Sequence, residues 1–153
     1  GDLPTAEALG RVVGEVRRHR RAGTGHHPLG RLAPERWLRA VVVARPALVG
    51  AVELEPVEGA VARQRVDEVT PAIALGTGAD GTAVVVACSV GIDLDLVPAA
   101  ADARLAHAPD ARLVLALPER DAVTVTRRLA GALAIPAEVR TVPGDWPTLL
   151  AGR

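Results

Sequence analysis

The apolar run Ala83–Val90 constrains the fold of this 153-residue chain more than any other feature. It reads Ala-Val-Val-Val-Ala-Cys-Ser-Val, which is the length of a strand and far short of the roughly 20 apolar residues that span a membrane. A strand that is apolar on both faces is typical of a sheet that helices cover on both sides. We therefore expect a three-layer α/β fold with this strand near its centre.

The segments around this run indicate a mixed sheet. Hydrophobic periodicity and end signals predict helices over 5–21, 34–45, 98–107 and 121–133, and strands over 49–55, 71–75, 83–90, 112–117 and 137–142. The element order is thus ααβββαβαβ. Because strands and helices alternate in the second half, we expect its three strands to be parallel, with an antiparallel hairpin added before them. The length predicts one domain over 1–153, in which the two N-terminal helices pack on a body over 49–142.

Two of the predicted helices carry apolar stripes that we expect to face the core. Trp37 lies on the stripe of the helix over 34–45. Asp121 stands where the cap of the helix over 121–133 belongs, and the stripe of that helix is Val125, Leu129 and Leu133.

The composition excludes several kinds of chemistry. The chain has no Lys, Phe, Tyr, Met or Asn, which is typical of a GC-rich bacterial genome. Without lysine there is no Schiff-base lysine and no P-loop lysine. The lone cysteine, Cys88, excludes an intrachain disulfide and any metal site built from several cysteines. With no visible signal peptide or membrane span, we expect a cytoplasmic protein without membrane contact.

Three short motifs resemble functional ones. Gly76–Gly81 spells G-x-G-x-x-G, but a strand is predicted after it where a dinucleotide site needs a helix, so we interpret it as a hairpin. Ala87–Gly91 resembles a nucleophile elbow around Ser89, although Cys88 and its neighbours are more typical of a buried strand. The pair His26-His27 either begins a metal site or is an exposed loop pair.

From the second predicted helix onward, over about 34–117, the order α-β-β-β-α-β resembles the core of restriction-endonuclease-like folds. The catalytic signature of that family is an acid on the second core strand and Glu-x-Lys, or a close variant, on the third. Here the second strand reads Pro71-Ala72-Ile73-Ala74-Leu75 and the third Val84-Val85-Val86-Ala87-Cys88-Ser89-Val90. The resemblance therefore implies the topology, while the catalytic motif is absent.

Acidic residues follow the predicted parallel strands. The candidate rim site comprises Asp93, Asp95, Glu119, Arg120 and Asp121. Open α/β sheets bind ligands at the carboxyl ends of their strands, and clustered carboxylates suit a hard divalent cation. The alternative is structural: Asp95 and Asp121 would cap helices, and Arg120 would neutralise its neighbours. No cofactor is predicted, except for a divalent metal if the rim is a site.

Charge is divided unevenly along the chain. Residues 1–45 hold nine Arg and four acids, a charge of +5, and residues 46–153 hold nine Arg and fourteen acids, a charge of −5. The basic segment either packs against the acidic body or faces an anionic partner such as a nucleic acid. The candidate anion-binding residues are Arg17, Arg18, Arg20 and Arg21. Few aromatic side chains are present for stacking on bases, which weakens the nucleic-acid alternative.

Two functional hypotheses follow from these observations. The first is a non-catalytic domain with an interaction or scaffold role, which forms a homo-oligomer. The alternative is a divalent-metal-dependent hydrolase or nucleic-acid-acting enzyme that uses the acidic rim.

Overall fold

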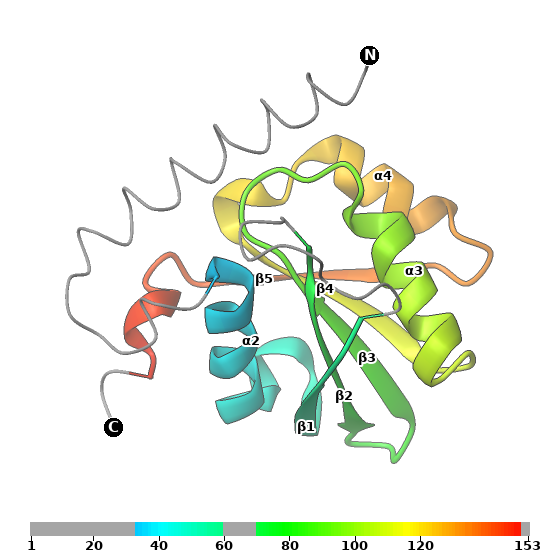
Figure 1. Ribbon diagram of the computed structural model, residues 1–153, viewed down its shortest axis with the longest axis horizontal. Coiled ribbons are helices and arrows are strands. Elements are labelled where there is room, and N and C mark those ends of the chain that lie inside the picture. Colours follow the sequence, from blue (N-terminus) through cyan, green and yellow to red (C-terminus); the bar gives the residue numbers. More distant parts are fainter. Residues whose placement is uncertain (1–32, 60–69, 151–153) are drawn as a thin grey trace.

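The computed structural model describes residues 33–59 and 70–150 (Figure 1). The helix predicted over 5–21, the four candidate anion-binding arginines and the pair His26-His27 lie outside the described residues. From residue 34 onward the elements follow the predicted order. The helices are α2 (Pro34–Ala44), α3 (Leu96–His107) and α4 (Thr124–Ala132); the strands are β1 (Ala51–Val57), β2 (Ala72–Gly78), β3 (Ala83–Cys88), β4 (Arg112–Pro118) and β5 (Glu138–Val142); the 3₁₀ turns are η2 (Pro46–Val49), η3 (Glu119–Asp121) and η4 (Trp146–Thr148).

The five strands form one mixed sheet in the order β1-β2-β3-β4-β5. β1, β2 and β3 are antiparallel neighbours, whereas β3, β4 and β5 are parallel. Cys88 on β3 lies opposite Ala72 of β2 and Ala116 of β4, so β3 is the central strand. The sheet confirms the predicted fold class, a mixed sheet in which an antiparallel part precedes three parallel strands.

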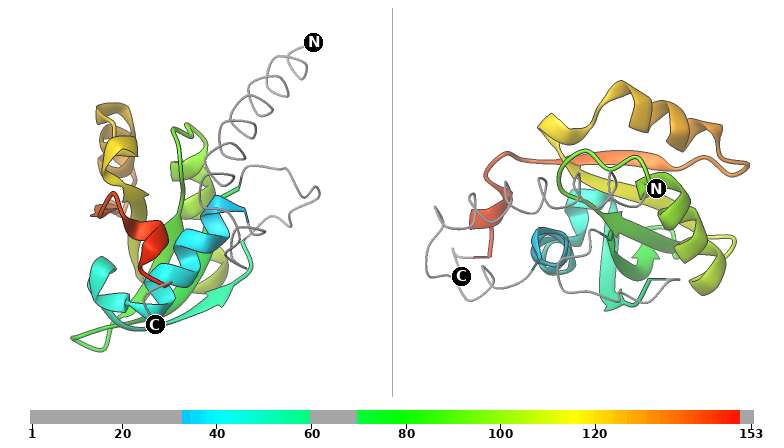
Figure 2. Two further views of the ribbon diagram at one scale, coloured as in Figure 1. Left: turned by 90° about the vertical axis from the view of Figure 1, so that its left-hand side faces the viewer. Right: turned by 45° about the horizontal axis from the view of Figure 1, so that its top comes forward.

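Helices cover both faces of the sheet, with α2 on one face and α3 and α4 on the other (Figures 1 and 2). Successive side chains of a strand point to opposite faces, so β3 supplies two separate cores. Val84, Val86 and Cys88 pack toward α2, and Val85 and Ala87 pack toward α3. All five are fully buried, which confirms that this strand is central and covered on both faces.

Helix α4 differs from the prediction in its start and in the face it buries. It begins at Thr124, because Asp121 belongs to η3 and Val123 is the N-cap residue. Thr126 and Ala130 are its buried side chains, whereas Val125 and Leu129 are exposed. Successive residues of a helix are separated by about 100° around its axis. The buried side of α4 is therefore rotated by about one residue from the side that the sequence predicts. The prediction that Asp121 caps this helix was therefore wrong, and of the predicted stripe Leu133 packs against the core, whereas Val125 and Leu129 do not.

The other boundaries differ only slightly from the predictions. α3 starts at Leu96, two residues before the predicted start at Pro98. Proline is tolerated in this first turn because the backbone N–H groups there have no partner within the helix. The glycine-rich stretch forms the end of β2 and the turn into β3, and Gly81 has a φ of 80°. Asp80 accepts hydrogen bonds from the backbone nitrogen and the hydroxyl of Thr82, at 3.1 and 2.6 Å. The G-x-G-x-x-G sequence is thus a hairpin, as its Asp80-Gly81 pair predicts.

Candidate functional site

The five candidate rim residues lie beyond the carboxyl ends of β3 and β4, as the parallel arrangement predicts. The segment with Asp93 and Asp95 leads from β3 into α3, and η3 follows β4 directly and holds Glu119, Arg120 and Asp121. The two segments are neighbours because their strands are paired along the sheet.

Two acids of this rim, Asp93 and Asp121, accept hydrogen bonds from the backbone. Asp121 is only 7% exposed, and its Oδ2 accepts a hydrogen bond of 2.8 Å from the backbone nitrogen of Gly91. Gly91 has a φ of 88°, a conformation that glycine adopts without steric cost. Asp93 Oδ1 accepts a hydrogen bond of 2.9 Å from the backbone nitrogen of Asp95, which turns the chain into α3. These bonds fix the path of the loop after the central strand.

The remaining rim residues make fewer contacts. Glu119 and Arg120 are exposed, and Asp95 is the N-cap residue of α3 but makes no side-chain capping bond. Across residues 33–59 and 70–150, no group of three His, Cys, Asp or Glu side chains is arranged to hold a metal ion.

Asp95 lines a cavity of about 290 Å³ at the end of the sheet where β2 begins. Helix α2 contributes Arg36 and Arg39 to the cavity, and α3 contributes Asp102 besides the N-cap residue. Ala72 and Ile73 of β2 and Pro98 and Ala99 of α3 supply apolar lining. The sequence prediction missed both arginines and Asp102. The spacing of Arg36 and Arg39, three residues apart in a predicted helix, could have indicated that both side chains lie on the same side of that helix.

Arg39 links the helix to the sheet beside this cavity. Its Nη1 donates to the carbonyl oxygens of Val57 at 3.1 Å and Ile73 at 3.2 Å, at the end of β1 and the start of β2. Partial burial lowers the pKa of the Arg39 guanidinium because the charged form loses water. The group nonetheless keeps its charge near neutral pH, and its other N–H groups remain as donors.

The strands next to the cavity carry no catalytic group of the expected kind. The resemblance implies an acid on the second strand and Glu-x-Lys on the third, but neither β2 nor β3 has an acidic residue or a lysine. At the end of the sheet next to the cavity, Ala72 of β2 is paired with Cys88 of β3. Cys88 is fully buried, and desolvation raises the pKa of its thiol to about 12. Ser89 is 1% exposed, and Val90–Asp95 separate it from α3. Ser89 therefore does not stand on the sharp strand-to-helix turn of a nucleophile elbow.

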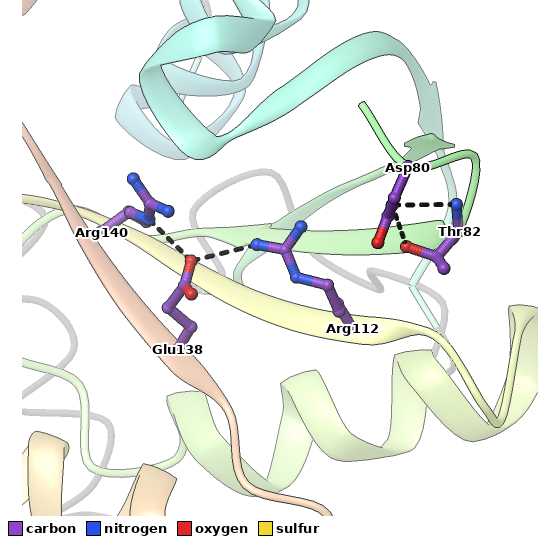
Figure 3. A network of polar contacts seen from close by, with 5 residues as sticks. All are labelled: Asp80, Thr82, Arg112, Glu138 and Arg140. Carbon is purple, nitrogen blue, oxygen red and sulfur yellow. Dashed lines mark hydrogen bonds and ion pairs between the residues drawn. The ribbon is translucent and has the colours of Figure 1, made fainter. Parts of the chain in front are cut away.

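A second group of charges lies at the opposite end of the parallel strands (Figure 3). Glu138 Oε2 accepts hydrogen bonds from Arg140 Nε at 2.6 Å and from Arg112 Nη2 at 3.3 Å. The bond from Arg140 is the main reason why the pKa of Glu138 lies below its usual value. These side chains are partly exposed, so the ion pairs add little stability. The pair of Arg112 and Glu138 joins β4 to β5, whereas Arg140 and Glu138 both belong to β5.

The outer surface of α4 and the loop after it expose apolar side chains, as do the loop before α3 and Leu105 of α3. Val125 and Leu129 are 45% and 39% exposed, and Ile135, in the loop after the helix, is 50% exposed. Arg104 of α3 donates to the Ile135 carbonyl oxygen at 2.7 Å, which holds this loop beside α3. An apolar helix surface left in water is typical of a contact site for another protein.

None of the helices in the described ranges is long and apolar enough to cross a membrane. No protein-family model matches the chain, and no curated protein matches it. Among solved structures, one described as the structure of EndoMS in apo form is similar, with 15% sequence identity and a TM-score of 0.44 over 72% of this chain and 47% of that chain. The chain thus spans about half the length of that structure. The assignment of the fold rests on the strand order and directions given above.

Proposed function

We propose that this chain is a non-catalytic interaction domain that associates with a second copy of itself through the outer surface of α4. The observation that carries the proposal is the exposure of Val125, Leu129 and Ile135, on and beside a helix whose buried side chains are Thr126 and Ala130. Burying apolar surface of this kind is the main favourable term in protein association. A two-fold contact would cover the same surface on both copies.

The roles of the reactive side chains support a domain without its own chemistry. Cys88 and Ser89 are packed into the sheet, and Asp93 and Asp121 accept backbone hydrogen bonds that shape the loop after β3. A single free cysteine fits a reducing compartment such as the cytoplasm. The metal-dependent hydrolase or nucleic-acid enzyme is the competing hypothesis, and no contact between described residues favours it.

Multi-angle light scattering of the full chain over a concentration series tests the proposal. We expect the mass to rise toward that of a dimer, and we expect Leu129→Arg to shift the chain to monomer because it places a charge in the apolar contact. Val52→Arg is the matched control, since Val52 is 59% exposed on β1, the strand at the other edge of the sheet. A monomer at every concentration, or a dimer that Leu129→Arg leaves intact, would contradict the proposal.

A further inference from the structure

We propose that the cavity between α2, the start of β2 and the start of α3 binds a small zwitterion of the size of a free amino acid. In this proposal the ligand carboxylate lies against Arg36 and Arg39, and its ammonium group lies against Asp95 and Asp102. The site is separate from the surface of α4, so it does not depend on self-association.

The charges of the cavity come from separate elements and are of opposite sign. Both arginines belong to α2, which covers one face of the sheet, and both aspartates belong to α3 and its N-cap, on the other face. In the part of the chain that the structure describes, neither arginine forms an ion pair with either aspartate. A ligand that carries both charges would pair with the two groups at once, which neither a simple anion nor a simple cation does.

The balance of charge favours a zwitterion over an anion. Glu58 also lines the cavity, so three carboxylates face two guanidinium groups. Inorganic phosphate would meet Arg36 and Arg39 but also the repulsion of the acids. A lone metal ion lacks a suitable group of ligands among the described residues.

The size and the apolar lining restrict the ligand further. The cavity volume of about 290 Å³ lies at the lower end of the range for small-molecule sites. Ile73, Pro98 and Ala99 offer apolar contact between the charged groups. Desolvation around Arg39, whose Nη1 is fixed by two carbonyl oxygens, strengthens its attraction for a carboxylate. These features suit an amino acid with an aliphatic side chain.

The test begins with a thermal-shift panel of the twenty free amino acids on the full chain, followed by calorimetry of those that raise the melting temperature. We expect at least one aliphatic amino acid to bind in a saturable way. Its N-acetyl derivative lacks the ammonium charge, and its amide lacks the carboxylate, so both should bind at least about tenfold more weakly. Inorganic phosphate is titrated in the same way, as a test of whether the cavity binds a simple anion instead, and it should bind more weakly than the amino acid.

Two variants and two matched controls locate the site. Arg36→Gln and Asp102→Asn should each weaken binding by about tenfold or more, because each removes one charge-assisted contact. Arg120→Gln and Asp110→Asn change exposed residues that do not line the cavity, and should leave the affinity unchanged. The proposal is overturned if no amino acid binds, if the N-acetyl derivative or phosphate binds as well as the amino acid, or if Arg36→Gln and Asp102→Asn have no effect.

Discussion

Single residues show how the fold uses its scarce reactive groups. Cys88 is the one cysteine of the chain, and its side chain is part of the core between the sheet and α2. A thiol reacts as the thiolate, and desolvation raises the pKa of Cys88 to about 12. At pH 8 the thiol is therefore protonated as well as covered. The interpretation of Cys88 as a small core residue, which follows from its place in an apolar strand, agrees with this environment.

We expect Cys88 in the folded chain to be inert toward a disulfide reagent such as dithionitrobenzoate at pH 8, and to react fully once denaturant unfolds the chain. Because the chain has no other cysteine, the absorbance signal reports this position alone. The unfolded sample is the control for reagent and protein concentration. Rapid, complete labelling under native conditions would show that the thiol is accessible, in conflict with its position in the core.

At the scale of elements, one rim acid, Asp121, connects segments that are distant in the sequence. The bond from Gly91 to Asp121 joins the loop after β3 to the 3₁₀ turn after β4. Predicting that the rim residues gather at one edge was possible, because adjacent parallel strands end at the same edge. The hydrogen bond itself was not predictable, since it depends on η3 forming where a helix start was expected.

Asp121→Ala should lower the free energy of unfolding by about 1.5–3 kcal/mol, the range for a hydrogen bond to a charged group. Glu119→Ala is the control, because Glu119 is exposed in the same turn and should change stability by no more than about 0.5 kcal/mol. Urea denaturation followed by circular dichroism measures both. Equal effects of the two substitutions would show that the bond from Gly91 has no special role.

The orientation of α4 shows what hydrophobic periodicity in a sequence cannot predict. The spacing of Val125, Leu129 and Leu133 identifies an apolar stripe, but it does not show how far that stripe is covered. The helix packs against the edge strand β5, where the small side chains of Thr126 and Ala130 are buried. The sequence pattern thus predicted the helix and missed its exposed surface, on which the proposed self-association depends.

For the molecule as a whole, the central strand determined most of what could be predicted. Its apolar residues on both faces required two helical layers, and the alternation after it required parallel neighbours. The cavity beside Arg36 and Asp102 was not predictable in the same way. It forms where α2 and α3, on opposite faces, both reach the start of β2, and no local pattern encodes that meeting.

The whole molecule is therefore built on a five-stranded mixed sheet whose second and third strands carry packing residues. Three groups of charged residues can be distinguished among the described ones: Asp93 and Asp121 in the rim after β3 and β4, the ion pairs of Glu138, and the cavity at the start of β2, which also includes Asp95 of the rim. We assign a structural role to the first two and ligand binding to the third. We propose, as the central claim, that the carboxylates of the acidic rim shape the loop after β3 and do not bind a metal ion.

Isothermal titration calorimetry with Mn²⁺ and Mg²⁺ tests that claim most directly. With the full chain, we predict no saturable binding heat for either ion, and the same flat titration for Asp93→Ala. Saturable binding in the natural sequence that Asp93→Ala abolishes would contradict the account and would favour the metal-dependent enzyme.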